Sequence, residues 1–295
     1  MNSSSPTVDL TVLDLSAGSA ALPEVENIEF AQSGSAAKPR LGVWFGEGVA
    51  NALMARALLY RLAAHYSNAD WVLLGPADSA CFFEMDRPVT VFIPLLGLQR
   101  RRPSQSRLNY WWGARQQLRR LRAVGLQRVF GVQPDGHKEW VSLGRQLHCP
   151  CHAMLGALDA FLSLPHPTLQ AGPSALAYST HIFRSTPPHK IKEVLFVGLH
   201  ATDSQSLSAL QAGLDSIAEV DSVSVERVVA VLSELPDFMQ RRLAEKHPDW
   251  HWVTVTQAFG LLGYADRVVA ATNDITLIGH EMGRGALFVL DKTHS

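Results

Sequence analysis

The chain has 295 residues, 47% of them hydrophobic, and a formal net charge of −1 at pH 7, which does not by itself indicate a partner. This length is enough for two domains, and three cysteines are too few for a disulfide scaffold, which fits a reducing compartment. No apolar run reaches the roughly 18 to 20 residues that a membrane span needs. We therefore expect a soluble, cytoplasmic protein.

The first 38 residues differ from the rest of the chain. They are rich in Ser and Ala, and their five acidic residues precede the first basic residue, Lys38. They lack the basic start and apolar middle of a secretory signal. We predict a flexible tail over 1–38 rather than a targeting or secretion segment, because so little apolar surface cannot offset the entropy of ordering.

Residues 39–165 alternate between short apolar runs and stretches with apolar residues at helical spacing. The predicted strands are 41–45, 71–75, 89–95 and 128–132, and the predicted helices are 50–65, 116–124, 138–147 and 157–163. Strands that alternate with helices form parallel βαβ units, so this half is predicted to be one doubly wound domain.

A stretch rich in Pro, His and Ser follows, and residues 166–189 are predicted to be a linker. Residues 190–295 then repeat the alternation as a second, short domain. Its predicted strands are 193–198, 225–232, 250–255, 267–271 and 286–291, and its predicted helices are 207–218 and 237–247. The predicted fold is α/β and GT-B-like, with two Rossmann-like domains that face a cleft. The chain contains neither G-x-G-x-x-G nor G-x-x-x-x-G-K-[ST], which disfavours dinucleotide and P-loop enzymes.

The stretch Thr272–Gly283 places polar side chains where an apolar run ends. In an open α/β sheet, the carboxyl end of a strand meets a crevice, and the next helix points its free N–H groups at an anion bound there. We therefore predict a binding edge formed by Asn273, Asp274, Thr276 and His280.

Several stretches, which together span most of Leu41–Leu290, resemble the heptosyltransferases of glycosyltransferase family nine. L-G-V-W-F-G-E-G-V-A-N-A-L, over Leu41–Leu53, is similar to the family's I-L-V-I-R-L-G-G-I-G-D-V-L. R-V-F-G-V-Q-P-D-G-H-K-E-W is similar to the strand and loop late in its acceptor domain, and R-V-V-A-A-T-N-D-I-T-L-I-G-H to its N-D-T-G-x-x-H stretch. The resemblance implies transfer of a hexose or heptose from a nucleotide sugar, which is a substrate, with no cofactor.

The resemblance also implies a catalytic position that this chain has changed. Family members carry an aspartate, the base for the attacking hydroxyl, where this chain has Asn51. An amide cannot accept a proton in this role. Glu47 lies four residues earlier and is the substitute that we would test, the alternative being an ordinary solvated carboxylate.

The implied donor site is also altered. Asn273 and Asp274 match the motif, but Thr276 replaces its glycine and His280 lies one residue beyond its histidine. The family's K-x-W-P segment has no counterpart after the strand 193–198. His200, Thr202 and Ser204 follow that strand and could bind phosphate through hydroxyl and N–H groups, or could simply cap the helix predicted from residue 207.

Arginines gather in the first half of the chain. Between residues 99 and 128 there are nine arginines and no acidic residue, interleaved with Tyr110, Trp111 and Trp112. Such a local positive field favours an anionic partner, and the resemblance implies a phosphorylated glycolipid acceptor. The predicted acceptor-binding residues are Arg100, Arg101, Arg102, Arg107 and Arg115. A peripheral membrane surface is also a possible partner. Nucleic acid is disfavoured, because no binding motif accompanies the arginines. The remaining alternative is a solvated helix face with no partner.

The stretch H-C-P-C-H, over 148–152, concentrates metal-ligand types. It lacks the C-x-x-C pairing of zinc sites and a second pair elsewhere, so buried thiols and no metal are predicted.

Two functions remain open. One is a glycosyltransferase acting on an anionic glycolipid or glycan, and the other is a catalytically degenerate GT-B protein that binds ligands in surface-glycan assembly.

Overall fold

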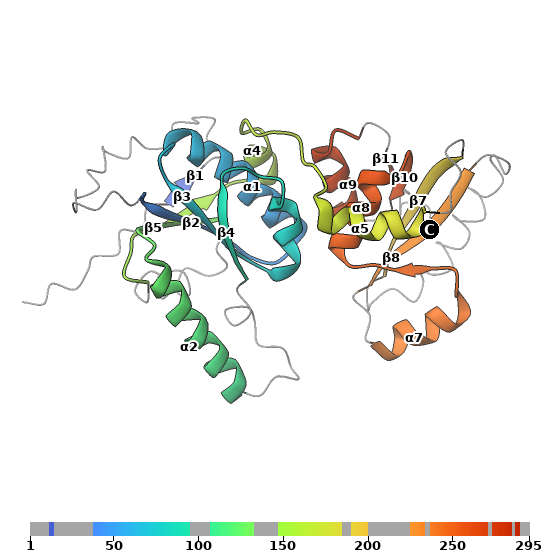
Figure 1. Ribbon diagram of the computed structural model, residues 1–295, viewed down its shortest axis with the longest axis horizontal. Coiled ribbons are helices and arrows are strands. Elements are labelled where there is room, and N and C mark those ends of the chain that lie inside the picture. Colours follow the sequence, from blue (N-terminus) through green and yellow to red (C-terminus); the bar gives the residue numbers. More distant parts are fainter. Residues whose placement is uncertain are drawn as a thin grey trace, which may run out of the picture. The chain divides into compact units, whose positions relative to one another are not determined.

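The chain folds as two units, shown in the computed structural model of Figure 1. The structure describes residues 12–14, 38–94, 107–132, 147–184, 190–199, 225–233, 237–270, 273–284 and 287–289. Unit 1 comprises Met1–Pro167 and unit 2 comprises Thr168–Ser295. The chain therefore passes from one unit to the other once.

Unit 1 is built on a six-stranded sheet in which every strand pair is parallel. Its strands are β1 (Val12–Asp14), β2 (Arg40–Phe45), β3 (Asp70–Gly75), β4 (Val89–Pro94), β5 (Arg128–Val132) and β6 (Cys151–Leu155). Their order is β1-β6-β5-β2-β3-β4. The chain first winds outward from β2 to β4 and then returns to β5 on the other side, so the topological switch point lies between β2 and β5.

Helices cover both faces of this sheet. On one face, Leu121 of α2 (Arg107–Val124) joins a core cluster with Val72, Leu74 and Val129, and Leu118 and Val124 pack against it. On the opposite face, α1 (Val49–His65) packs against β2 and β5. The alternate side chains of β2 that point to this face, Leu41, Val43 and Phe45, are almost fully buried. The described part of unit 1 also contains the 3₁₀ helix η2 (Ala77–Phe83) and the helix α4 (Leu158–Leu162).

The edge of unit 1 differs from the sequence-based expectation. Val12–Asp14 pairs with β6 in parallel, so the predicted tail contains a short strand. The other residues before Lys38 lie outside the described part of the chain. A strand of three residues is too short to show a hydrophobic pattern in the sequence. This strand forms because its backbone pairs with β6.

Unit 2 repeats the arrangement with five parallel strands. They are β7 (Ile191–Leu199), β8 (Val225–Ser233), β9 (His251–Trp252), β10 (Arg267–Ala270) and β11 (Leu287–Val289). The order β11-β10-β7-β8-β9 places the switch point between β7 and β10. Together the two sheets confirm the predicted α/β class with Rossmann-like, doubly wound halves.

Helices again flank the second sheet. Leu243 of α7 (Asp237–Lys246) packs against the cluster around Leu195 and Val231. The helix α8 (Val255–Tyr264) packs against β7 and β8, and it also contacts α9 (Asn273–Glu281). It begins with a capping box in which Thr254 and Gln257 bind each other's backbone N–H groups.

The predicted linker over 166–189 contains a helix of unit 2. This helix, α5 (Pro173–Ile182), packs so closely on α8 that a Cβ atom added to Gly260 would lie 1.9 Å from the Ala175 carbonyl oxygen. The Pro and Ser content of this stretch suggested a linker, but Pro173 stands in the first turn, where proline is tolerated.

Candidate functional site

The turn after β2 carries the two predicted catalytic residues. Gly48 has φ +101°, a backbone conformation that favours glycine, and α1 begins at the next residue. The Asn51 Nδ2 atom donates a hydrogen bond of 2.7 Å to the backbone carbonyl of Glu47. The side chain of Glu47 is exposed to solvent. The structure therefore places both residues in one turn at the carboxyl end of β2, beside the switch point of unit 1.

The hydrogen bond to Glu47 explains why an amide suits position 51. Asn51 uses its N–H group as a donor that holds the turn, and an ionised aspartate has no such donor. An aspartate here would leave the Glu47 carbonyl without this bond. The structure thus shows Asn51 as a hydrogen-bond donor within the turn that carries Glu47.

Unit 2 brings two distant stretches to its own switch point. The parallel pairing of β7 with β10 runs from Glu193 opposite Arg267 to Phe196 opposite Ala270. The segments after these strands therefore leave the same edge of the sheet. Asn273 follows β10 closely, whereas His200, Thr202 and Ser204 follow β7 but lie outside the described residues.

The helix α9 carries four of the predicted donor-binding residues, and they lie at different positions along its axis. Asn273 and Asp274 are exposed in the first turn of the helix. Thr276 is half-buried one turn further on. His280 lies in the last turn, with its side chain 80% exposed and its Nδ1 atom 3.5 Å from the Glu281 carboxylate. At about 1.5 Å per residue, six residues separate His280 from Asp274 by about 9 Å along the helix axis.

The arginine-rich segment contributes a cationic helix face. Arg100, Arg101 and Arg102 lie outside the described residues, and Arg107 is the first residue of α2. The inward side of α2 is defined by Leu118, Leu121 and Val124. The arginines on the outer part of the helix are all exposed: Arg115, Arg119, Arg120 and Arg122. The last three were not among the predicted site residues, although their spacing around the leucines indicated an outward face.

The side chains of the H-C-P-C-H stretch lie on two faces of the first sheet. Cys149 and Cys151 are buried in the core cluster under α2, whereas His152 stacks on Phe130 on the opposite face of the sheet, with ring centroids 5.4 Å apart. A hydrogen bond with Cys149 and burial both raise the pKa of the Cys151 thiol, which disfavours the thiolate that metals bind. Within the described ranges, no three His, Cys, Asp or Glu residues are grouped to hold a metal ion.

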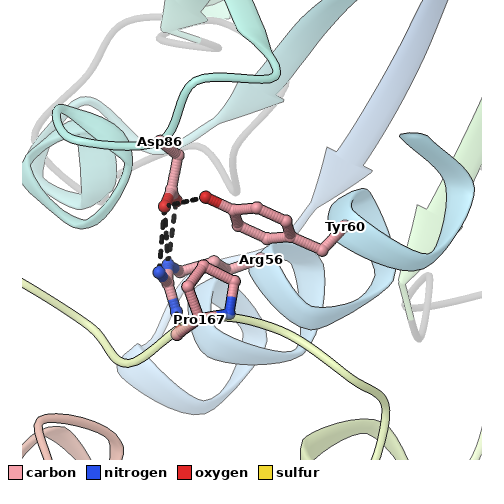
Figure 2. A network of polar contacts seen from close by, with 4 residues as sticks. All are labelled: Arg56, Tyr60, Asp86 and Pro167. Carbon is pink, nitrogen blue, oxygen red and sulfur yellow. Dashed lines mark hydrogen bonds and ion pairs between the residues drawn. The ribbon is translucent and has the colours of Figure 1, made fainter. Parts of the chain in front are cut away.

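A buried ion pair that sequence reasoning missed lies within unit 1. Figure 2 shows Arg56 of α1 against Asp86, with both side chains only 3% exposed. The Arg56 Nε atom lies 3.1 and 2.8 Å from the two Asp86 carboxylate oxygens, and its Nη2 atom lies 2.9 Å from Oδ1. The Tyr60 hydroxyl donates to the same carboxylate at 2.8 Å. Burial, together with this hydrogen bond, raises the pKa of Tyr60 to about 12.

The same guanidinium binds the end of unit 1. Its Nη1 atom donates a 2.8 Å hydrogen bond to the carbonyl of Pro167, the last residue of the unit (Figure 2). The Arg56 guanidinium therefore donates to the Asp86 carboxylate through Nε and Nη2 and to the Pro167 backbone carbonyl through Nη1.

Comparison with known proteins identifies the fold. No family model matches the sequence, and no curated protein matches it. Among solved structures, the chain is similar to the E. coli ADP-heptose LPS heptosyltransferase II, with 14% identity, a TM-score of 0.56 and coverage of 84% of this chain and 83% of that one. It is similar to a family 9 glycosyl transferase from Veillonella parvula, with 10% identity, a TM-score of 0.58 and coverage of 83% and 79%.

A third similar structure is the E. coli heptosyltransferase WaaC with ADP-2-deoxy-2-fluoro heptose. The identity is 13%, the TM-score is 0.50, and the alignment covers 87% of this chain and 90% of that one. The chain has a GT-B-like fold. In the described part of the chain, no helix combines the length and apolar character that crossing a membrane requires.

Proposed function

We propose that the chain is a glycosyltransferase that moves a sugar from a nucleotide-sugar donor to an anionic glycolipid or glycan. The observation that carries the proposal is that Glu47 and Asn51 follow β2 at the switch point of unit 1, and that Asn273 and Asp274 follow β10 at the switch point of unit 2. Open α/β sheets bind ligands at such points. The GT-B-like fold supports it, because the three similar structures described above are glycosyltransferases by name, and one holds ADP-2-deoxy-2-fluoro heptose.

On the donor side, the first turn of α9 suits a diphosphate. The positive end of the helix dipole attracts phosphate oxygens. The Asp274 carboxylate suits a hydroxyl group of the ribose or sugar rather than the phosphate, because like charges repel. Asn273 supplies both an amide donor and an acceptor. His200, Thr202, Ser204 and the more distant His280 stay predictions for this site.

On the acceptor side, we assign the base to Glu47. Its carboxylate takes the proton from the acceptor hydroxyl, whose oxygen then forms a bond to the anomeric carbon of the donor sugar. The bond from that carbon to the diphosphate breaks, and the nucleoside diphosphate leaves with the bonding electron pair. Asn51 holds the turn that carries Glu47.

A ligand-binding test addresses the donor site first. A nucleotide sugar that binds the folded chain should raise its melting temperature by mass action. The variant Asp274→Ala should lose that shift. Asp159→Ala is the matched control, because Asp159 is also an exposed aspartate in the first turn of a helix, but in unit 1. A shift that survives Asp274→Ala, or that disappears equally in the control, would contradict this donor site.

A second test separates an enzyme from a binding protein. Glu47→Gln should lower turnover by roughly two to four orders of magnitude while donor binding persists. Asn51→Asp should also lower it, because the hydrogen bond to the Glu47 carbonyl is lost. A faster Asn51→Asp variant would instead make residue 51 the base position. If the native chain binds donor and transfers no sugar to any anionic acceptor, the alternative of a catalytically degenerate binding protein is correct.

The anionic acceptor is supported by the outward face of α2. Arg119 and Arg120 are exposed there. The expected partner is therefore an anionic glycolipid or the anionic surface of the cytoplasmic membrane. Binding to vesicles that contain an anionic glycolipid should weaken with salt, because exposed charges are screened within about 8 Å at physiological ionic strength. Serine at both positions should weaken it further, and serine at Arg241 and Arg242, exposed in unit 2, should not. Equal loss in both variants would refute a specific role for α2.

A further inference from the structure

Two of the three cysteines of the chain lie next to each other in the core of unit 1. Cys149 and Cys151 belong to the buried cluster beneath α2, and they are 7% and 0% exposed. Pro150 between them is exposed, and its carbonyl accepts a 3.0 Å hydrogen bond from the N–H group of Val129 in β5. The backbone here thus continues the pairing of β6 with β5. In such an extended chain, side chains two residues apart point to the same face of the sheet.

The spacing of these two cysteines permits a bond between their sulfur atoms. At about 3.3 Å per residue, two residues of extended chain place the Cα atoms about 6.6 Å apart. Disulfides span Cα separations of about 4.4–6.8 Å. The Cys151 Sγ atom lies 3.6 Å from the Cys149 carbonyl oxygen, so it points toward residue 149. The sulfur atoms can therefore meet by rotation of the side chains, with little movement of the backbone.

The two thiols differ in exposure and in ionisation. Cys149 lies in the turn before β6, next to His148, which is exposed and has φ +56°. A hydrogen bond with Cys151 lowers the pKa of the Cys149 thiol, whereas the same hydrogen bond and burial raise the pKa of the Cys151 thiol. Because the thiolate is the nucleophile, the more accessible thiol with the lowered pKa reacts first. This order makes Cys149 the attacking thiol and Cys151 the thiol that reacts second.

We propose that Cys149 and Cys151 form a redox-reactive dithiol, which hydrogen peroxide oxidises to a disulfide within the chain. The Cys149 thiolate attacks one peroxide oxygen, so an S–O bond forms, the O–O bond breaks, and the leaving hydroxide takes up a proton to become water. The Cys151 sulfur then attacks the Cys149 sulfur. An S–S bond forms, the S–O bond breaks, and the second hydroxide leaves as water with the Cys151 proton. The sulfur atoms together lose two electrons, which the peroxide accepts, and a reducing dithiol reverses the reaction by exchange.

Cys81 is a matched control within the same unit. It is 5% exposed, which lies between the values for Cys149 and Cys151, and its Sγ atom donates to the Asp78 carbonyl at 3.4 Å. It belongs to η2 and lies outside the cluster that contains the other two cysteines. Burial is therefore similar for all three thiols, and a neighbouring thiol is what distinguishes Cys149 and Cys151 from Cys81.

The test exposes the full chain to hydrogen peroxide, blocks the remaining thiols with iodoacetamide in denaturant, and measures the masses of the chain and of its peptides. The peptide with Cys149 and Cys151 should lose the mass of two hydrogen atoms, at least about tenfold faster than Cys81 is oxidised. Dithiothreitol should restore both thiols. The proposal would be overturned by oxidation of Cys81 at the same rate, by a disulfide between chains, or by three thiols that persist at peroxide levels that oxidise the amino acid cysteine.

Single substitutions separate the roles of the two thiols. Cys151→Ser should leave a sulfenic acid at Cys149 that dimedone traps, because no second thiol displaces the hydroxide. Cys149→Ser should leave Cys151 as slow to oxidise as Cys81, and Cys81→Ser should leave disulfide formation unchanged. Trapping at Cys151 in Cys149→Ser, at the rate found for Cys149, would refute the assignment of Cys149 as the attacking thiol.

The same reagents report whether each variant is folded. Cys81 is buried in unit 1, so it should resist iodoacetamide in the Cys149 and Cys151 variants until denaturant is added. None of these measurements needs a sugar donor or acceptor. Failure of the redox proposal and failure of the proposed function are therefore distinguishable.

Discussion

Replacing Arg56 with methionine removes the cation from the buried network of unit 1 and keeps a side chain of similar reach. The Asp86 carboxylate, 3% exposed, then loses its bonds to Nε and Nη2, and the Pro167 carbonyl loses its bond to Nη1. Removing one partner of a buried pair leaves an uncompensated charge and costs about 3–5 kcal/mol. We expect a loss of that size in the free energy of unfolding of unit 1.

Hydrogen exchange measures this loss unit by unit. At about 1.4 kcal/mol per factor of ten, the loss corresponds to exchange faster by about two to four orders of magnitude for the protected amides of α1. Amides of α8 in unit 2 serve as the internal control and should keep their native rates. Arg56→Met combined with Asp86→Asn should recover part of the loss, because no unpaired charge remains.

Two results would refute the reasoning about this pair. Acceleration of less than about fivefold in α1 would mean that the ion pair contributes less than about 1 kcal/mol, as exposed pairs do. Equal acceleration in α8 would mean that the substitution acts on the whole chain rather than through the network in unit 1.

Three further predictions concern local features. The pKa of Tyr60 is raised to about 12 in the folded state, so its contribution to stability should be complete below about pH 10 and lost as the pH rises toward 12. In chemical denaturation, the free energy of unfolding of Tyr60→Phe should therefore fall less steeply over that range than that of the native chain. An equally steep fall would contradict the assignment. Gly260→Ala should destabilise unit 2 by about 1–3 kcal/mol or more, because the added methyl group would meet the Ala175 carbonyl at 1.9 Å. Urea unfolding checks this, with a neutral effect excluding the close α5–α8 contact. Thr254→Ala should cost about 1 kcal/mol through loss of the cap on α8, and Thr254→Ser should restore it.

Most strands were predictable, because a buried parallel strand needs a short apolar run and the chain shows these runs plainly. β2, β3, β5 and β7 lie within a residue or two of their predicted bounds. The missed helix α8 begins at Val255, the last residue of V-T-V, which was interpreted as the end of a strand. The capping box at Thr254 and Gln257 was the signal that could have identified its start.

The site was predictable in position more than in detail. Polar residues directly after the predicted strands 41–45 and 267–271 indicated two candidate binding edges, because carboxyl ends of parallel strands share an edge. The sequence could not show that the Asn51 amide donates to the Glu47 carbonyl. That bond depends on how a glycine turn folds back on the first turn of a helix.

The sequence by itself determined the alternation of strands and helices, the parallel sheets that follow from it, and the edges that carry polar residues. These features depend on local periodicity, which a chain shows without being folded. Only the tertiary structure decided that Arg56, on a helix of mostly apolar residues, would be buried as a charge. Its partners Asp86 and Pro167 lie 30 and 111 residues away, and a buried guanidinium is tolerated only where such distant groups satisfy its donors.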